Sequence, residues 1–183
     1  MQVKGVAIIS MRNYILNKFG ARYEEWLRSL SPQARDIVAN VLSGDWYPVQ
    51  AGIVEPTRQI CALLHNGNER GAWELGRFSA DHALTGPYKI YVKLASSGFI
   101  LSRGSRIMAQ YYSPCELKSF EDGPKRGVVQ IISFEEPSSL IEMRIGGWIE
   151  RALEVGGEKI KRAEITCSLT KGDSMTEFVF EWE

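Results

Sequence analysis

The chain has 183 residues, enough for one domain to bury a sizeable core without disulfides or metals. Lys and Arg together number 22, and so do Asp and Glu, so the net charge is zero and the basic excess typical of nucleic-acid-binding proteins is missing. The three cysteines are widely spaced, which favours reduced thiols over disulfides. No apolar run approaches the roughly 18 residues of a membrane span, and no signal-peptide pattern is present. Together these features favour a cytoplasmic protein.

The first half of the sequence predicts helices. Residues 6–19 begin like a strand and continue as a helix that Gly20 closes. Ser31 followed by Pro32 is an N-cap with a first-turn proline, and Gly44 ends the helix that they begin. Pro56 predicts a kink in the next helix. We therefore expect helices over residues 6–19, 32–43, 45–64, 69–84, 87–95 and 99–112.

The second half changes to a period of two. Residues 126–134 are rich in β-branched side chains and predict a strand that pairs with residues 116–121 across a Gly-Pro turn. A helix capped at Ser138 runs through Val155. Alternation in the last hairpin assigns the odd-numbered side chains of residues 163–169 to a buried face and Ser168 to the wet face. On the second arm, the buried face is expected to hold Phe178, Phe180 and Trp182.

These elements predict an α+β fold. The N-terminal helices would pack on a four-stranded antiparallel sheet built from two hairpins with an intervening helix. No linker or repeat divides the chain, so we expect one domain over residues 1–183. Within it, the helical part would span about residues 1–113 and the hairpin–helix–hairpin part about residues 114–183.

The sequence offers few residues suited to catalysis or metal binding. It has two histidines: His65 is expected at a helix C-terminus and His82 as a partly buried packing residue. It contains no G-x-S-x-G, C-x-x-C or H-x-x-x-H pattern. An enzyme that uses Cys115 or His82 is the weakest interpretation. We therefore predict that the protein is not an enzyme, and we expect no metal site and no cofactor.

Aromatic side chains, Phe99 among them, are concentrated on the predicted helices that must cover the sheet. They form either an ordinary core or an aromatic-lined pocket for a small molecule between helices and sheet. The candidate pocket residues are Trp73, Phe78, Tyr88, Tyr91, Met108, Tyr111, Tyr112 and Trp148.

Gly146 and Gly147 lie inside the last predicted helix, where each glycine costs about 1 kcal/mol relative to alanine. Something must offset that cost. The two explanations are close packing against another element and close approach of a ligand.

Several short motifs follow one another along nearly the whole chain. They are Trp-Tyr-Pro at 46–48, Glu-Leu-Gly-Arg at 74–77, Gly-Pro-Tyr at 86–88, Tyr-Tyr-Ser-Pro at 111–114, Gly-Trp at 147–148 and Glu-Phe-Val-Phe-Glu-Trp at 177–182. Together they resemble a bacterial family of unassigned function related to haem nitric-oxide/oxygen-binding domains and to 4-vinyl reductase domains. The latter are similar to subunits of the TRAPP vesicle-tethering complex. The resemblance implies a sensory scaffold.

The ligand-binding residues that the resemblance implies are missing. Haem-binding relatives carry an iron-ligating histidine on the helix before the first hairpin, whereas residues 106–112 contain none. Met108, Tyr111 or Tyr112 could ligate iron in principle, but each is more simply a packing residue. The Tyr-x-Ser-x-Arg clamp on haem is absent from residues 128–134. Zinc-binding relatives pair two cysteines at the closing hairpin, where this chain has Cys167 and Met175.

The sequence thus favours a non-enzymatic sensory or adaptor domain that binds a small apolar or amphipathic molecule, such as a lipid, between helices and sheet. The alternative is a homodimeric protein–protein module without a pocket, and a signalling or polarity protein is another conceivable partner. A haem-binding gas sensor ranks below both. Nucleic acid is not an expected partner.

Overall fold

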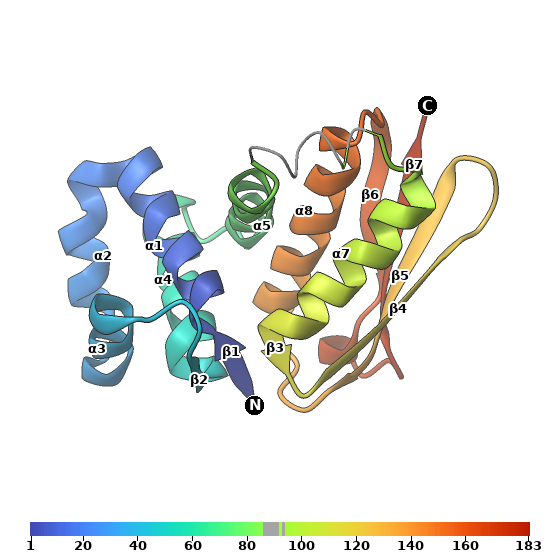
Figure 1. The fold of residues 1–183 in the computed structure, drawn as a ribbon. Helices are drawn as coiled ribbons and strands as arrows, with labels where there is room; N and C mark the ends of the chain where they lie inside the picture. The colour runs from blue at the N-terminus through green and yellow to red at the C-terminus, as the bar shows by residue number, and fades with distance from the viewer. Residues whose placement is uncertain (86–91, 93) are drawn as a thin grey trace.

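The structure is a computed structural model that describes residues 1–85, 92 and 94–183. It places the N-terminal helices in a cluster on one side, α5 (Arg70–Ala83) in the middle, and two further helices and a sheet on the other side (Figure 1). The predicted helix over residues 87–95 lies largely outside the described residues.

The N-terminal cluster contains β1 (Gln2–Lys4), α1 (Gly5–Phe19), a 3-10 turn (Gly20–Arg22), α2 (Tyr23–Ser29), α3 (Pro32–Asn40), β2 (Trp46–Pro48) and α4 (Glu55–Leu64). Ser31 is confirmed as the N-cap of α3, and its hydroxyl accepts a hydrogen bond from the Ala34 amide at 3.3 Å. The helix ends at Asn40, before the expected Gly44, because Val41 turns to an extended conformation that leads towards β2. The fully buried Trp26 joins α2 to α4, since its indole donates to the Pro56 carbonyl at 3.1 Å.

The predicted helix over residues 45–64 is wrong in its first part. Trp46–Pro48 is a strand that pairs with β1, and a π-helical turn, Gln50–Val54, then leads into α4. Pro56, where a kink was predicted, is the second residue of α4, so it lies where the π-helical turn changes to the α-helix. Asn66 and Gly67 end it, as predicted, with left-handed φ values of 53° and 78°.

A small sheet that the sequence did not predict joins the two sides of the molecule. β1 lies between β2 and β3 (Tyr112–Ser113), and both pairs are antiparallel. Strands of two or three residues are too short to show a period of two, so the sequence pattern does not predict them.

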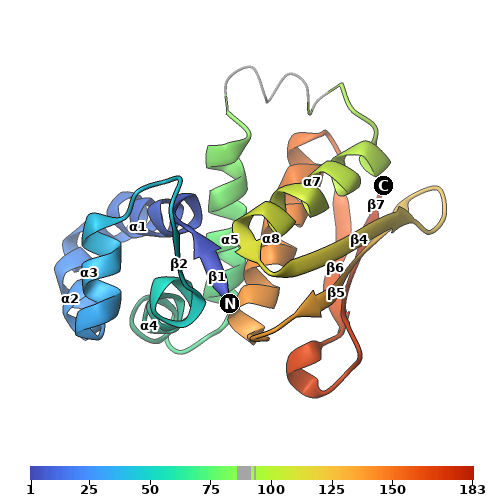
Figure 2. The same cartoon turned by 60° about the horizontal axis from the view of Figure 1, so that its bottom comes forward.

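The larger sheet confirms the predicted α+β fold. Its strands are β4 (Cys115–Glu121), β5 (Arg126–Phe134), β6 (Ile160–Cys167) and β7 (Thr176–Trp182), in the antiparallel order β4-β5-β7-β6. The helices α7 (Ser97–Tyr111) and α8 (Ser139–Val155) cover one face (Figures 1 and 2). The other face carries charged side chains, so the last hairpin has one buried and one solvent-exposed side, as predicted.

The expected position of Ser168 on the wet face is wrong. The register shifts between Ile165 and Cys167, which ends the regular alternation before Ser168. Its side chain is buried and its hydroxyl donates to a carboxylate oxygen of the buried Glu142 at 2.7 Å. Thr176 donates to the same carboxylate at 2.5 Å, so the loop between β6 and β7 is anchored to α8.

The helices α5 and α8 cross in direct backbone contact. A methyl group added at Gly76 would overlap the carbonyl oxygen of Arg144, and one added at Gly147 would overlap the carbonyl oxygen of Trp73. A methyl group at Gly146 would overlap the Trp73 ring. Close helix packing, one of the two explanations for the paired glycines, is therefore confirmed. No helix in the described part of the chain is both long and apolar enough to cross a membrane.

Candidate functional site

Four of the predicted pocket residues meet in the interior. Met108, Tyr111, Tyr112 and Trp148 line a small cavity between α1, α5, α7, α8 and the start of β3. The cavity measures about 20 Å³, which is room for about one water molecule. Apart from this cavity, the four side chains belong to the core.

The other predicted pocket residues lie elsewhere. Trp73 is buried beside Glu150, to which its indole donates a hydrogen bond at 2.7 Å. Phe78 is half-buried, and its ring and that of Tyr14 form an edge-to-face pair. Tyr88 and Tyr91 fall outside the described residues.

The interior cavity has a charged side chain that sequence reasoning missed. Arg144 lines it from α8 and is only 4 % exposed. Its guanidinium donates to the Thr57 hydroxyl at 3.3 Å and to the Ala7 carbonyl at 3.4 Å. A usable signal was present: Arg144 lies three residues after Ile141 and four before Trp148, on the apolar face of the helix.

Two further polar groups belong to residues that line this cavity. The buried Trp148 indole N–H has no hydrogen-bond partner among the described residues. Burial raises the pKa of the Tyr112 hydroxyl, and the nearby Arg144 charge only partly opposes that rise, so the hydroxyl stays protonated at neutral pH.

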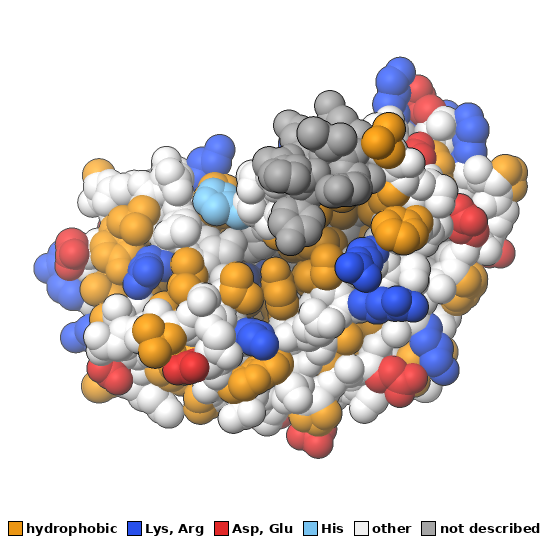
Figure 3. Space-filling model, in the orientation of Figure 1, with side chains coloured by type: hydrophobic (Ala, Val, Ile, Leu, Met, Phe, Trp, Pro, Cys, Tyr) orange, Lys and Arg blue, Asp and Glu red, His pale blue; other side chains and the backbone are white. Residues whose placement is uncertain are grey.

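A much larger concavity lies on the outer side of α7. It measures about 1070 Å³, is open to solvent, and runs between α7 and the end of α5. We call this concavity the α7 groove, and its described lining residues are Leu84, Val92, Leu94, Ala95, Ser96, Phe99, Arg103, Arg106, Ile107 and Gln110. Hydrophobic and basic side chains lie side by side over α7 on this face of the molecule (Figure 3).

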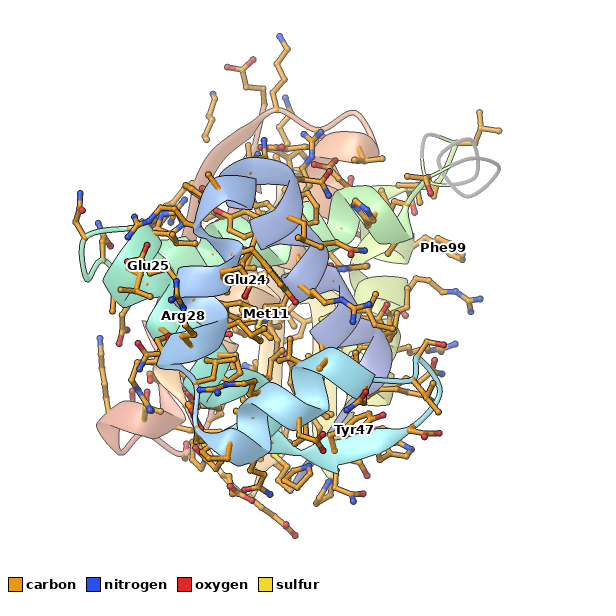
Figure 4. All side chains as sticks on the ribbon, turned by 90° about the vertical axis from the view of Figure 1, so that its left-hand side faces the viewer. Met11, Glu24, Glu25, Arg28, Tyr47 and Phe99 are labelled. Carbon is orange, nitrogen blue, oxygen red and sulfur yellow. The ribbon has the colours of Figure 1, made fainter. Side chains whose placement is uncertain are left out.

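The helical repeat of α7 explains the composition of the groove. Phe99, Arg103, Arg106 and Gln110 follow one another at spacings of three and four residues, so they share one side of the helix. Phe99 is 59 % exposed and projects away from the body of the protein (Figure 4). The opposite side of α7, with Leu101 and other buried residues, packs on the sheet.

A small cavity of about 40 Å³ lies beneath the groove. It shares Phe99, Arg103 and Ile107 with the groove, and it reaches Trp148 and Ala152 on α8. Trp148 therefore lies between this cavity and the one beside Arg144.

The histidines and cysteines form no catalytic pair in the described structure. His65 follows the last residue of α4, and its Nε2 shares a hydrogen bond of 3.0 Å with the Tyr14 hydroxyl. His82 is exposed and lies against the Phe78 ring, so its expected partial burial is wrong. No hydrogen bond among the described residues joins a histidine side chain to a cysteine, and no cluster of three or more metal-ligating side chains is found among them.

Cys115 is expected to be a poor nucleophile. Burial raises its pKa to about 12, so the thiolate fraction at pH 8 is very small. We expect iodoacetamide to modify Cys115 in the native protein at least about 100-fold more slowly than in urea. Peptide mass spectrometry over a time course measures both rates. Equal rates in the two states would contradict the buried thiol and revive the enzyme interpretation.

Comparisons with solved structures identify the fold. An H-NOX protein from S. oneidensis in the Fe(II)NO ligation state matches with a TM-score of 0.74 at 12% identity, over 98% of this chain and 99% of that chain. An Fe(II) unliganded H-NOX protein from K. algicida matches with a TM-score of 0.69 at 12% identity, over 98% of this chain and 96% of that chain. No protein-family model matches, and no curated protein sequence matches. The similarity shows an H-NOX-like fold, whereas the relation to 4-vinyl reductase and TRAPP proteins stays a prediction.

The described residues of this chain do not fit a haem. The cavity between α1, α5, α7 and α8 is about 20 Å³, whereas a ligand of that size needs roughly 300 Å³ or more. α7 carries no histidine, and both histidines of the chain lie outside this cavity. The described lining of the α7 groove contains no His, Cys, Met or Tyr side chain to ligate iron.

Proposed function

We propose that this protein is a non-enzymatic sensory domain that binds a small amphipathic anion in the α7 groove. The observation that carries the proposal is an open apolar groove with two arginines on its rim. The position differs from the sequence expectation of a site between helices and sheet, because core side chains such as Ile145 and Phe178 fill that space.

The apolar part of the groove suits a hydrocarbon chain. It is lined by Leu84, Val92, Phe99 and Ile107. The groove volume of about 1070 Å³ is large enough to hold a drug-sized ligand. The distance along α7 from Phe99 to Gln110 is about 16 Å at 1.5 Å per residue, which accommodates an acyl chain of medium length. Burial of Phe99 by a ligand would remove a large exposed apolar surface from water.

The charge of the groove favours an anionic head group. Arg103 and Arg106 make no ion pair or side-chain hydrogen bond with the described residues, although both line the groove. No carboxylate is among the described lining residues. Guanidinium groups bind carboxylate and phosphate through paired hydrogen bonds, which gives a head-group preference.

The test compares three probes that share a 12-carbon chain. We expect laurate to bind more tightly than dodecanol, and dodecyltrimethylammonium to bind least, in calorimetric titrations below the micelle concentration. The double variant Arg103→Gln/Arg106→Gln should bind laurate about tenfold more weakly, since each lost charge-assisted contact at an exposed site is worth a fraction of a kcal/mol or more. Phe99→Asp should weaken the binding of all three probes.

Two control variants match these changes. Arg58→Gln removes an exposed arginine on α4, and Leu42→Asp changes an apolar residue that is 62 % exposed, both outside the groove. Neither should alter laurate binding. Equal binding of the three probes, or equal weakening by the control variants, would contradict the proposal.

A second candidate is a homodimer formed through the same groove. Leu94 is 83 % exposed and Phe99 is 59 % exposed, and an open apolar patch on a helical face is also typical of a protein interface. Sedimentation velocity separates the two functions. A dimer that Phe99→Asp dissociates, and Leu42→Asp does not, would favour the interface, whereas a monomer that binds laurate would favour the ligand.

A further inference from the structure

Arg144 is a buried cation without a described anionic partner. Its side chain is 4 % exposed, and none of the ion pairs among the described residues includes it. Its two hydrogen bonds, at 3.3 and 3.4 Å, go to neutral acceptors and leave part of the five-donor guanidinium unused. A buried charge that lacks a counter-charge is costly, so a compensating group is expected.

The cavity beside Arg144 is lined by hydrogen-bond donors and, among the described residues, by no carboxylate. Its described polar lining consists of Arg144, Tyr111, Tyr112, Trp148, whose indole N–H is unpaired among the described residues, and Ser79, whose hydroxyl shares a hydrogen bond of 2.7 Å with Ser10. The remaining lining residues, Ala7, Gly76 and Met108, are apolar. A site rich in donors, with a positive charge and no acidic side chain, is complementary to an anion.

The size of the cavity restricts the anion. About 20 Å³ accommodates one water molecule or one ion of similar size, and it excludes sulfate, phosphate and organic acids. We propose that this cavity binds a single halide-sized anion, represented by chloride, through Arg144. The site is separate from the α7 groove, and its argument does not depend on the proposed function.

The position of Arg144 gives the anion a structural consequence. Arg144 on α8 contacts the Ala7 carbonyl on α1 and the Thr57 hydroxyl on α4, so it connects the N-terminal cluster to the helices on the sheet. An anion at Arg144 would offset the cost of burying that charge and stabilise this junction. The folded protein should therefore become more stable as the chloride concentration rises.

The test measures thermal unfolding in 150 mM sodium chloride and in 150 mM sodium gluconate. Ionic strength is the same in both, and gluconate is too large for the cavity. We expect the Tm of the wild type to be higher in chloride by on the order of 2 to 4 °C. Arg144→Met should lose this difference, whereas the exposed control Arg58→Met and the groove variant Arg103→Gln/Arg106→Gln should retain it.

A second measurement covers the case in which Arg144→Met does not fold. Crystals of the wild type soaked in bromide should show an anomalous difference peak in contact with the Arg144 guanidinium. Equal Tm values in chloride and gluconate, or the same chloride effect in a folded Arg144→Met, would overturn the proposal. A bromide peak without any chloride effect in solution would mean binding at crystal concentration only, and would overturn it as well.

Discussion

Gly147→Ala is expected to lower the free energy of unfolding by about 2 to 4 kcal/mol, as is typical of severe overpacking in a core. Helix propensity alone predicts the opposite sign, because alanine within a helix is favoured over glycine by about 1 kcal/mol. The added methyl group would overlap the Trp73 carbonyl, and a backbone atom cannot move aside as a side chain can. The helices α5 and α8 would have to separate, which would disturb the core on both sides of the contact.

Urea unfolding followed by circular dichroism measures this loss. Gly20→Ala is the matched control, since nothing lies within 4 Å of its Cβ position and its φ is −48°, so its stability should be unchanged or slightly raised. Gly76→Ala should also destabilise, because its methyl group would meet the Arg144 carbonyl at the same crossing. The two changes together should cost less than their sum, since the first already separates the helices. A stabilised Gly147→Ala would contradict the close crossing.

Arg77→Met is expected to lower the free energy of unfolding at pH 7 by about 2 to 3 kcal/mol. Arg77 on α5 binds both Glu150 and Glu154 of α8, with the Glu154 contacts at 2.8 and 3.1 Å. The Glu150 side chain is 12 % exposed, so loss of the arginine would leave a largely buried carboxylate without its cation. Breaking a fully buried pair costs about 3 to 5 kcal/mol, and the 25 % exposure of the Arg77 side chain reduces that range.

The pH dependence of this variant has a definite sign. Burial of Glu154 raises its pKa, but hydrogen bonds from Arg77 and Arg151 outweigh burial, so the pKa lies below 4.5 in the folded protein. A lowered carboxyl pKa contributes stability above the unfolded value, and that contribution disappears as pH falls through the folded pKa. The stability difference between wild type and Arg77→Met should therefore narrow below about pH 4.5.

Urea unfolding at pH 7 and in the acid range checks this expectation. Arg162→Met is the control, because Arg162 pairs with Glu164 and Glu181 on the exposed face of the sheet, where solvent screens the interaction. It should change stability little at either pH. An Arg77→Met effect as small as that of Arg162→Met would mean that the contacts of α5 with α8 depend on the glycines rather than on the ion pairs.

The sequence by itself determined the elements whose signals are local. Ser31 and Pro32 mark the start of α3, and Asn66 and Gly67 end α4 because they adopt positive φ values. The last hairpin was predictable because a strand with one buried face must alternate along its own length, and the first because a run of β-branched residues follows a turn signal. Helical spacing of apolar residues revealed the apolar face of α8, and the low helix propensity of glycine showed that Gly146 and Gly147 need an explanation.

Only the tertiary structure decided which residues meet. The strand Trp46–Pro48 exists because β1 pairs with it, and Ser168 is buried because a register shift directs it to Glu142. Gly147 packs against the backbone of Trp73, which is far away in sequence. Of the predicted pocket residues that the structure describes, four line a small cavity, while Trp73 is buried in the core and Phe78 is half-buried, because side-chain volumes from several helices fill that space together. The same packing decided that Arg144 is buried, because the exposure of an arginine on an amphipathic helix depends on which elements pack over it.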